Sequence, residues 1–112
     1  MGRILIADDH DSLRRGLAQA LAEAGHDIEE APHGNNAIEK LHEGVFDVVV
    51  SDLKMGGSTG LDVLKTAKTL HPSCAVILMT AFGSVSTAVE AMKAGAFDYV
   101  QKPFEGSGLS RC

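Results

Sequence analysis

The chain has 112 residues, of which 45% are hydrophobic and 22% charged, with a formal net charge of −5. These values are typical of one globular domain with a single core, and they exclude disordered and fibrous proteins. The acidic balance argues against direct nucleic-acid binding, and no apolar run approaches the ~20 residues of a membrane span. Because Cys74 and Cys112 show neither metal-ligand spacing nor a disulfide framework, we expect a reducing, cytoplasmic location.

Short apolar runs alternate with helical patterns along the chain. In chain order they predict a strand at Arg3–Ala7, a helix from Leu13 to Ala24, a strand at Asp27–Ala31, a helix at Asn36–Glu43, a strand at Phe46–Ser51, a helix at Leu61–Leu70, a strand at Cys74–Thr80, a helix at Ser84–Ala94 and a strand at Phe97–Gln101. Gly25, Gly44 and Gly95 are stop signals for three of the helices, and Ser84 or Ser86 is the candidate N-cap of the last.

The apolar runs "ILIA", "VVV" and "AVILM" are continuous, which indicates strands buried on both faces of a parallel sheet. Five strand–helix units with short connections predict a doubly wound α/β sandwich. After Glu105 the chain reads "GSGLSRC", which has no helical period, so the last helix of such a fold is apparently missing. We therefore expect one domain at 1–105 and a cropped or vector-derived tail at 106–112. The apolar sheet face left bare would favour a homodimer or a swapped dimer.

Polar residues follow the strands at the edge where a parallel sheet places its functional crevice. Asp8 and Asp9 follow the first strand, Asp52 the third, Thr80 ends the fourth, and Lys102 follows the fifth. Carboxylates this close need a neutralising cation, and Mg²⁺ suits such oxygen ligands. An Asp nucleophile, a metal site, a hydroxyl and an ammonium group together suit an incoming phosphoryl group. Formation of an aspartyl phosphate is the resulting hypothesis.

Each of these residues alone has an ordinary structural explanation. A single Asp at a strand end most often forms a turn or caps a helix, and one of Asp8 and Asp9 could cap the helix that starts near Asp11. Thr80 alone would be a β-branched strand residue, and Lys102 a solvated surface charge. Their joint placement at the strand ends is what points to chemistry.

The segments "ILIADDH", "FDVVVSDLKM" with Gly60, "VILMTA" and "AGAFDYVQKPF" resemble the receiver domains of bacterial two-component response regulators, from about Arg3 to Glu105. The resemblance implies a flavodoxin-like sheet with strand order 2-1-3-4-5. It also implies that Asp52 is the phosphoacceptor and that Asp8, Asp9, Asp52 and the backbone carbonyl of Lys54 hold Mg²⁺.

The same resemblance implies a switch. Thr80 and Lys102 would turn toward the phosphoryl group, Tyr99 would rotate inward, and the Lys102–Pro103 peptide bond would be cis. The donor would be a histidine kinase, and the chain would act as a signalling switch rather than as an enzyme. The segment from Thr80 to Phe104 is especially similar to receivers of enhancer-binding transcriptional activators, in which an output domain follows the receiver.

The sequence departs from the family pattern beside the acceptor. Gly56 stands where proline is usual, Ser58 replaces Met, and Thr59 replaces Asp. Loss of the proline predicts about 1 kcal/mol of destabilisation, because the unfolded chain gains freedom. His10 occupies a position that is often acidic, which leaves one negative charge fewer near the metal.

Three other functions share single features with this sequence. A receiver-like module that binds partners without phosphorylation stays open. A phosphohydrolase of the haloacid-dehalogenase type needs a second Asp two residues after its nucleophile, where this chain has Lys54. A flavodoxin-like FMN carrier needs a hydroxyl-rich phosphate loop, whereas Asp8 and Asp9 would repel phosphate.

Overall fold

The computed structural model describes residues 2–55, 58–80 and 85–101. Along the chain the elements are β1 (Arg3–Ala7), α1 (Asp11–Glu23), β2 (Asp27–Ala31), α2 (Gly34–Glu43), β3 (Val48–Asp52), α3 (Gly60–Leu70), β4 (Ala75–Thr80), α4 (Val85–Lys93) and β5 (Asp98–Gln101). Of the two candidate N-caps of the last helix, Ser86 lies inside α4 and is therefore not the cap. The other candidate, Ser84, lies outside the described residues, as do the Lys102–Pro103 bond and the tail at 106–112.

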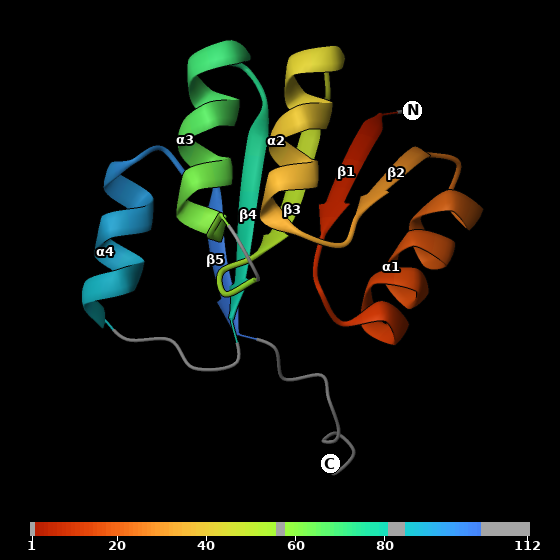
Figure 1. The fold of residues 1–112 in the computed structure, drawn as a ribbon, viewed down its shortest axis with the longest axis horizontal. Helices are drawn as coiled ribbons and strands as arrows, with labels where there is room; N and C mark the ends of the chain where they lie inside the picture. Colours follow the sequence, from red (N-terminus) through yellow and green to blue (C-terminus); the bar gives the residue numbers. More distant parts are fainter. Residues whose placement is uncertain (1, 56–57, 81–84, 102–112) are drawn as a thin grey trace, which may run out of the picture.

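The strands form one parallel sheet in the order β2-β1-β3-β4-β5, which confirms the expected topology (Figure 1). The carboxyl ends of the strands therefore meet at one edge, the lower edge in Figure 1. This edge is where the acids and Thr80 were expected to converge.

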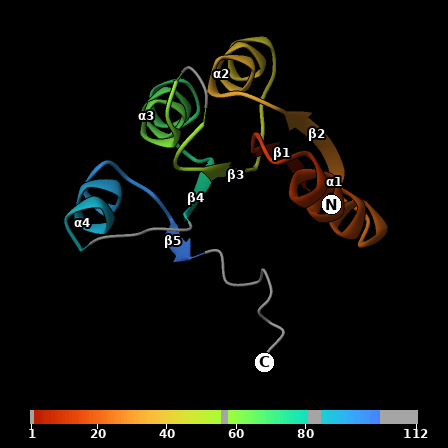
Figure 2. The same ribbon diagram turned by 60° about the horizontal axis from the view of Figure 1, so that its bottom comes forward.

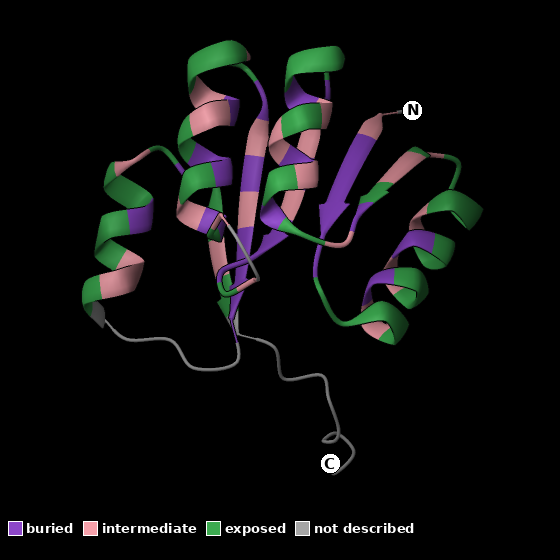
Figure 3. Ribbon diagram, in the orientation of Figure 1, coloured by how far each residue is buried: buried purple, intermediate pink, exposed green. Residues whose placement is uncertain are grey.

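The two faces of the sheet are covered unequally. Helices α2, α3 and α4 lie on one face and α1 on the other (Figure 2). The larger core includes Leu41, Leu64 and Leu78, whereas the core under α1 is built on Ile4, Ile6 and Ala18. Strand side chains alternate between the faces, so buried Val49 belongs to the larger core while its neighbours Val48 and Val50 are half-buried against the smaller one. Figure 3 shows the sheet between the helices as mostly buried or intermediate.

The predicted helices and strands are all present, and their bounds shift by a few residues. β3 begins at Val48, because the Asp47 carboxylate accepts the Arg3 amide at 2.8 Å just before regular pairing starts. Gly25 and Gly95 end α1 and α4 with φ of 102° and 103°, a conformation that favours glycine. Gly44 ends α2 with an extended backbone instead.

The helices and the cysteine of the described residues can be compared with what the composition predicted. Within the part of the chain that the structure describes, no helix has the length and apolar character needed to cross a bilayer. Cys74 is a buried free thiol, and burial raises its pKa.

Candidate functional site

Parallel pairing brings three polar side chains together at the carboxyl edge. Asp8 directly follows β1, Asp52 ends β3, and Thr80 ends β4. Because β3 lies between β1 and β4, Asp52 is the central member of this row. All three are buried, with exposed fractions of 0%, 4% and 2% respectively. The fold thus encloses two carboxylates and a hydroxyl at neighbouring strand ends.

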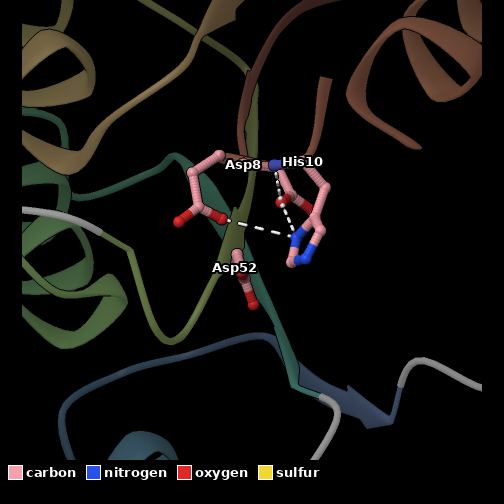
Figure 4. Close-up of side chains that lie close together, drawn as sticks. Asp8, His10 and Asp52 are labelled. Carbon is pink, nitrogen blue, oxygen red and sulfur yellow. Dashed lines mark hydrogen bonds and ion pairs between the residues drawn. The ribbon is translucent and has the colours of Figure 1, made fainter. Parts of the chain in front are cut away.

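Exposed residues of the β1–α1 turn complete the acidic group. Oxygen and nitrogen atoms of Asp8, Asp9, His10 and Asp52 lie within 4.8 Å of one another. His10 Nδ1 is 3.2 Å from Asp8 Oδ1 and 3.4 Å from Asp9 Oδ1, so the imidazole lies against both acids (Figure 4). The position that is often acidic in the family thus carries a ring that contacts the acid pair.

Asp8 also shapes the turn that carries it. Its Oδ1 accepts the backbone N–H of His10 at 2.9 Å, the local bond by which Asp residues stabilise turns. His10 is the N-cap of α1, and no side chain caps this helix. Of the two structural explanations for Asp8 and Asp9, the structure does not show capping of α1, whereas Asp8 does form a turn.

The donor set fits a small hard cation. Asp8, Asp9 and Asp52 offer carboxylate oxygens from two neighbouring strand ends, and Mg²⁺ and Ca²⁺ prefer such oxygen ligands. Three carboxylates gathered in so small a space repel one another unless a positive charge lies among them. The chemistry of the residues present therefore matches a divalent cation bound directly beside Asp52.

The turn behind Asp52 is held by backbone contacts. Leu53 donates its N–H to the Met79 carbonyl at 2.7 Å, and Gly60 donates to the Leu53 carbonyl at 2.9 Å. A Cβ on Gly60 would lie 2.5 Å from the Asp52 carbonyl oxygen and 2.8 Å from Leu53 Cα. The start of α3 thus presses against the backbone of Asp52 so closely that glycine is required.

Two departures from the family pattern have structural roles in this turn. Thr59 is the N-cap of α3 and forms a capping box with Asp62. Ser58 donates from its hydroxyl to Asn35 Oδ1 at 2.6 Å and from its backbone N–H to the same atom at 3.2 Å. These bonds tie the segment to α2 and α3, whereas Gly56 lies outside the described residues.

The remaining predicted site residues lie at different depths. The Lys54 side chain is exposed, two residues beyond Asp52. Tyr99 on β5 is half-buried against the larger core, and its enclosed hydroxyl finds no hydrogen-bond partner among the described residues. Lys102 lies outside the described residues, so its contact with the site stays a prediction.

Arg14 is a residue of the site that was not predicted from the sequence. Its guanidinium is buried and donates to the backbone carbonyl of Asp8 at 2.9 Å. A signal for it was present, because Arg14 falls on the same helical face as Leu17, Ala18 and Leu21, where an apolar residue would be expected.

Comparison with known proteins covers nearly the whole chain. The sequence model of the response regulator receiver domain matches residues 4–111. The transcriptional regulatory protein ZraR of Klebsiella oxytoca is 44% identical over 102 residues, which are 91% of this chain and 23% of that protein. The chain thus spans less than a quarter of the length of this relative.

Solved structures share the fold. The beryllofluoride-activated receiver domain dimer of NtrC4 has a TM-score of 0.83 and 36% identity, covering 91% of this chain and 84% of that one. A response regulator of Burkholderia pseudomallei, determined with a phosphorylated aspartic acid, a calcium ion and citrate, has a TM-score of 0.87 and 26% identity, covering 98% of this chain and 65% of that one.

Proposed function

This chain belongs to the response regulator receiver domain family, and on that premise we propose that Asp52 is the acceptor of its phosphoryl group. The observation that carries the proposal is the placement of Asp52. The residue is 4% exposed at the central strand end, and its carboxylate lies within 4.8 Å of the ligand atoms of Asp8 and Asp9. The relative from Burkholderia pseudomallei, whose structure contains a phosphorylated aspartic acid and a calcium ion, supports the same chemistry.

In the proposed reaction an Asp52 carboxylate oxygen attacks the phosphorus of a phosphohistidine. The new O–P bond forms as the P–N bond breaks, and the imidazole leaves with the electron pair of that bond. Asp8, Asp9 and Asp52 would hold Mg²⁺, with the backbone carbonyl of Lys54 as a further ligand. When bound, the ion supplies positive charge that neutralises the phosphoryl oxygens.

Thr80 would move toward the newly charged phosphoryl group. Its hydroxyl lies at the end of the neighbouring strand, and Lys102 would add an ammonium group from the end of β5. Tyr99 packs against the larger core on β5, the strand that pairs with β4, so a shift of Thr80 would change the packing of β5 and the surface near α4. Local charge would thereby bias an equilibrium between two surfaces.

The partners follow from this switch. The chain itself would be cytoplasmic. Its donor would be a histidine kinase, and the output a transcription-regulating domain that follows the receiver in the full protein. A homodimer, simple or swapped, is supported by the NtrC4 receiver dimer and by exposed Val89, Met92 and Phe97 on α4 and before β5. The domain itself would signal rather than turn over a substrate.

Labelling of Asp52 tests the proposal. With Mg²⁺ and acetyl phosphate, the wild-type protein should gain the mass of one phosphoryl group, and beryllofluoride should bind in its place. Asp52→Asn should lose both, because the amide is a poor nucleophile. Asp27→Asn, a matched change at an exposed position on the edge strand, should keep both.

The outcomes separate the candidate functions. Mg²⁺-dependent labelling that survives Asp52→Asn would move the acceptor to another residue. Wild-type protein that is neither labelled nor bound by beryllofluoride would favour the module that binds partners without phosphorylation. The haloacid-dehalogenase alternative is not supported, since the chain belongs to the receiver family and carries Lys54 where that enzyme class needs an acid.

A further inference from the structure

A buried guanidinium, that of Arg14, lies next to the acid pair Asp8 and Asp9. Arg14 is on α1 and only 5% exposed, because the face of the helix that it occupies packs against the sheet. Burial of an arginine is costly unless its charge is paired and its N–H groups are hydrogen-bonded. The contacts that offset this cost show what the side chain does.

Arg14 joins three segments of the chain. Its Nη1 donates to the backbone carbonyl of Asp8 at 2.9 Å and lies 2.9 Å from Asp11 Oδ1. Its Nε donates to Glu30 Oε1 at 3.0 Å. Burial works to lower the pKa of Arg14, but hydrogen bonds to Glu30 and Asp11, together with the attraction of their charges, outweigh burial and raise the pKa, so the group stays charged. One planar cation thus links the end of β1, the start of α1 and the edge strand β2.

The bond to Asp8 has a geometric consequence for Asp9. A peptide unit is planar, so a donor that fixes the Asp8 carbonyl also fixes the plane of the Asp8–Asp9 peptide. Asp8 is held from its other side as well, since its own N–H donates to the Ala31 carbonyl at 3.1 Å. Both peptide units that flank Asp8 are therefore held, and the Asp9–His10 peptide that follows is held by the bond from the His10 N–H to Asp8 Oδ1 at 2.9 Å. The backbone of the two acidic residues thus has little freedom to turn.

We propose that Arg14 is a positioning residue, which holds Asp8 and Asp9 in the arrangement that binds a divalent cation. The role deepens the proposed function and rests on it, because the cation serves phosphoryl transfer. The planar fork of the guanidinium lets one side chain bond a carbonyl and two carboxylates at fixed angles. Lysine at this position would keep the charge but lose the fork.

Mg²⁺ affinity, measured by calorimetry on folded protein without any phosphoryl donor, tests the role. Arg14→Lys should weaken Mg²⁺ binding about 10-fold, the effect expected when a partner that orients a metal ligand is lost. Arg15→Lys is the matched control, because Arg15 is the exposed neighbour on the same helix, and its Mg²⁺ affinity should equal that of the wild type. Urea unfolding of each variant separates positioning from stability.

A second variant keeps the test decisive if Arg14→Lys does not fold. Glu30→Gln removes one charged partner of Arg14 without touching the acid pair, and it should weaken Mg²⁺ binding to a smaller extent. A variant that loses stability but binds Mg²⁺ as the wild type does would show that Arg14 only fastens α1 to β2, and would overturn the proposal.

The measurement of Mg²⁺ affinity does not depend on phosphorylation of Asp52. Wild-type protein that binds Mg²⁺ but is not phosphorylated at Asp52 would count against the proposed function alone. Wild-type protein without Mg²⁺ affinity would overturn the positioning role, because there would be no cation for the acid pair to hold.

Discussion

Gly60 shows how tightly the backbone packs around Asp52. Its Cα lies where any side chain would meet the carbonyl oxygen of Asp52 and the Cα of Leu53. These atoms belong to the main chain at the end of β3, so they cannot move aside without displacing Asp52. A single residue without a side chain therefore sets the distance between α3 and the end of β3.

We expect Gly60→Ala to lower the free energy of unfolding by about 1–3 kcal/mol, the usual cost of forcing extra volume into a packed site. Urea denaturation measures the loss. Gly16→Ala is the matched control, because nothing lies within 4 Å of a Cβ at Gly16 on α1. There alanine should stabilise the helix by about 0.5–1 kcal/mol. Equal unfolding free energies for wild type and Gly60→Ala would contradict the close approach.

At the scale of elements, the segment before α3 replaces the usual family residues with bonds of its own. Thr59 and Asp62 cap the helix reciprocally, with Asp62 N–H to Thr59 Oγ1 at 3.3 Å and Thr59 N–H to Asp62 Oδ2 at 3.0 Å. Ser58 bonds Asn35 at the start of α2. These contacts stabilise the folded state, and so they offset part of the destabilisation expected from glycine in place of proline at position 56.

Thr59→Ala should cost about 1 kcal/mol of unfolding free energy, because an orphan amide at the start of α3 loses its acceptor. Chemical denaturation, read by far-UV circular dichroism, gives the difference. Thr69→Ala on the exposed end of the same helix should be neutral or slightly stabilising, since alanine is the better helix former. A Thr59→Ala protein as stable as the Thr69→Ala protein would show that the capping box contributes nothing.

At the scale of the whole molecule, the sheet separates a large core from a small one. Three helices cover the face of Val49, whereas α1 covers the face of Val48 and Val50, where these side chains stay half-buried. Neighbouring valines of one strand therefore have different surroundings with the same backbone pairing. The difference in burial should appear directly in stability.

Val49→Ala should lower the free energy of unfolding by about 1–3 kcal/mol, because it removes two methyl groups from a filled core. Val50→Ala should cost about half as much, because part of its side chain is already in contact with water. Urea midpoints of the two variants provide the comparison. Equal losses would indicate that both faces of β3 are equally enclosed.

The sequence by itself determined the order and type of the elements, because a helical period of 3.6 residues and short continuous apolar runs are local properties of the chain. It also placed Asp8, Asp52 and Thr80 at strand ends, and the rule for parallel sheets placed those ends at one edge. The shifts of element bounds came from particular contacts, such as the Asp47 carboxylate that takes the Arg3 amide before β3 begins.

Only the tertiary structure decided how the site is supported. The bonds of Arg14 to Asp8 and Glu30 join segments that meet only when α1 packs on the sheet. The Ser58–Asn35 bond likewise spans two helices brought together by the fold. The sequence period tells which face of its element a side chain occupies, but its partners depend on packing between elements. That packing supports the acids at the carboxyl edge of the sheet.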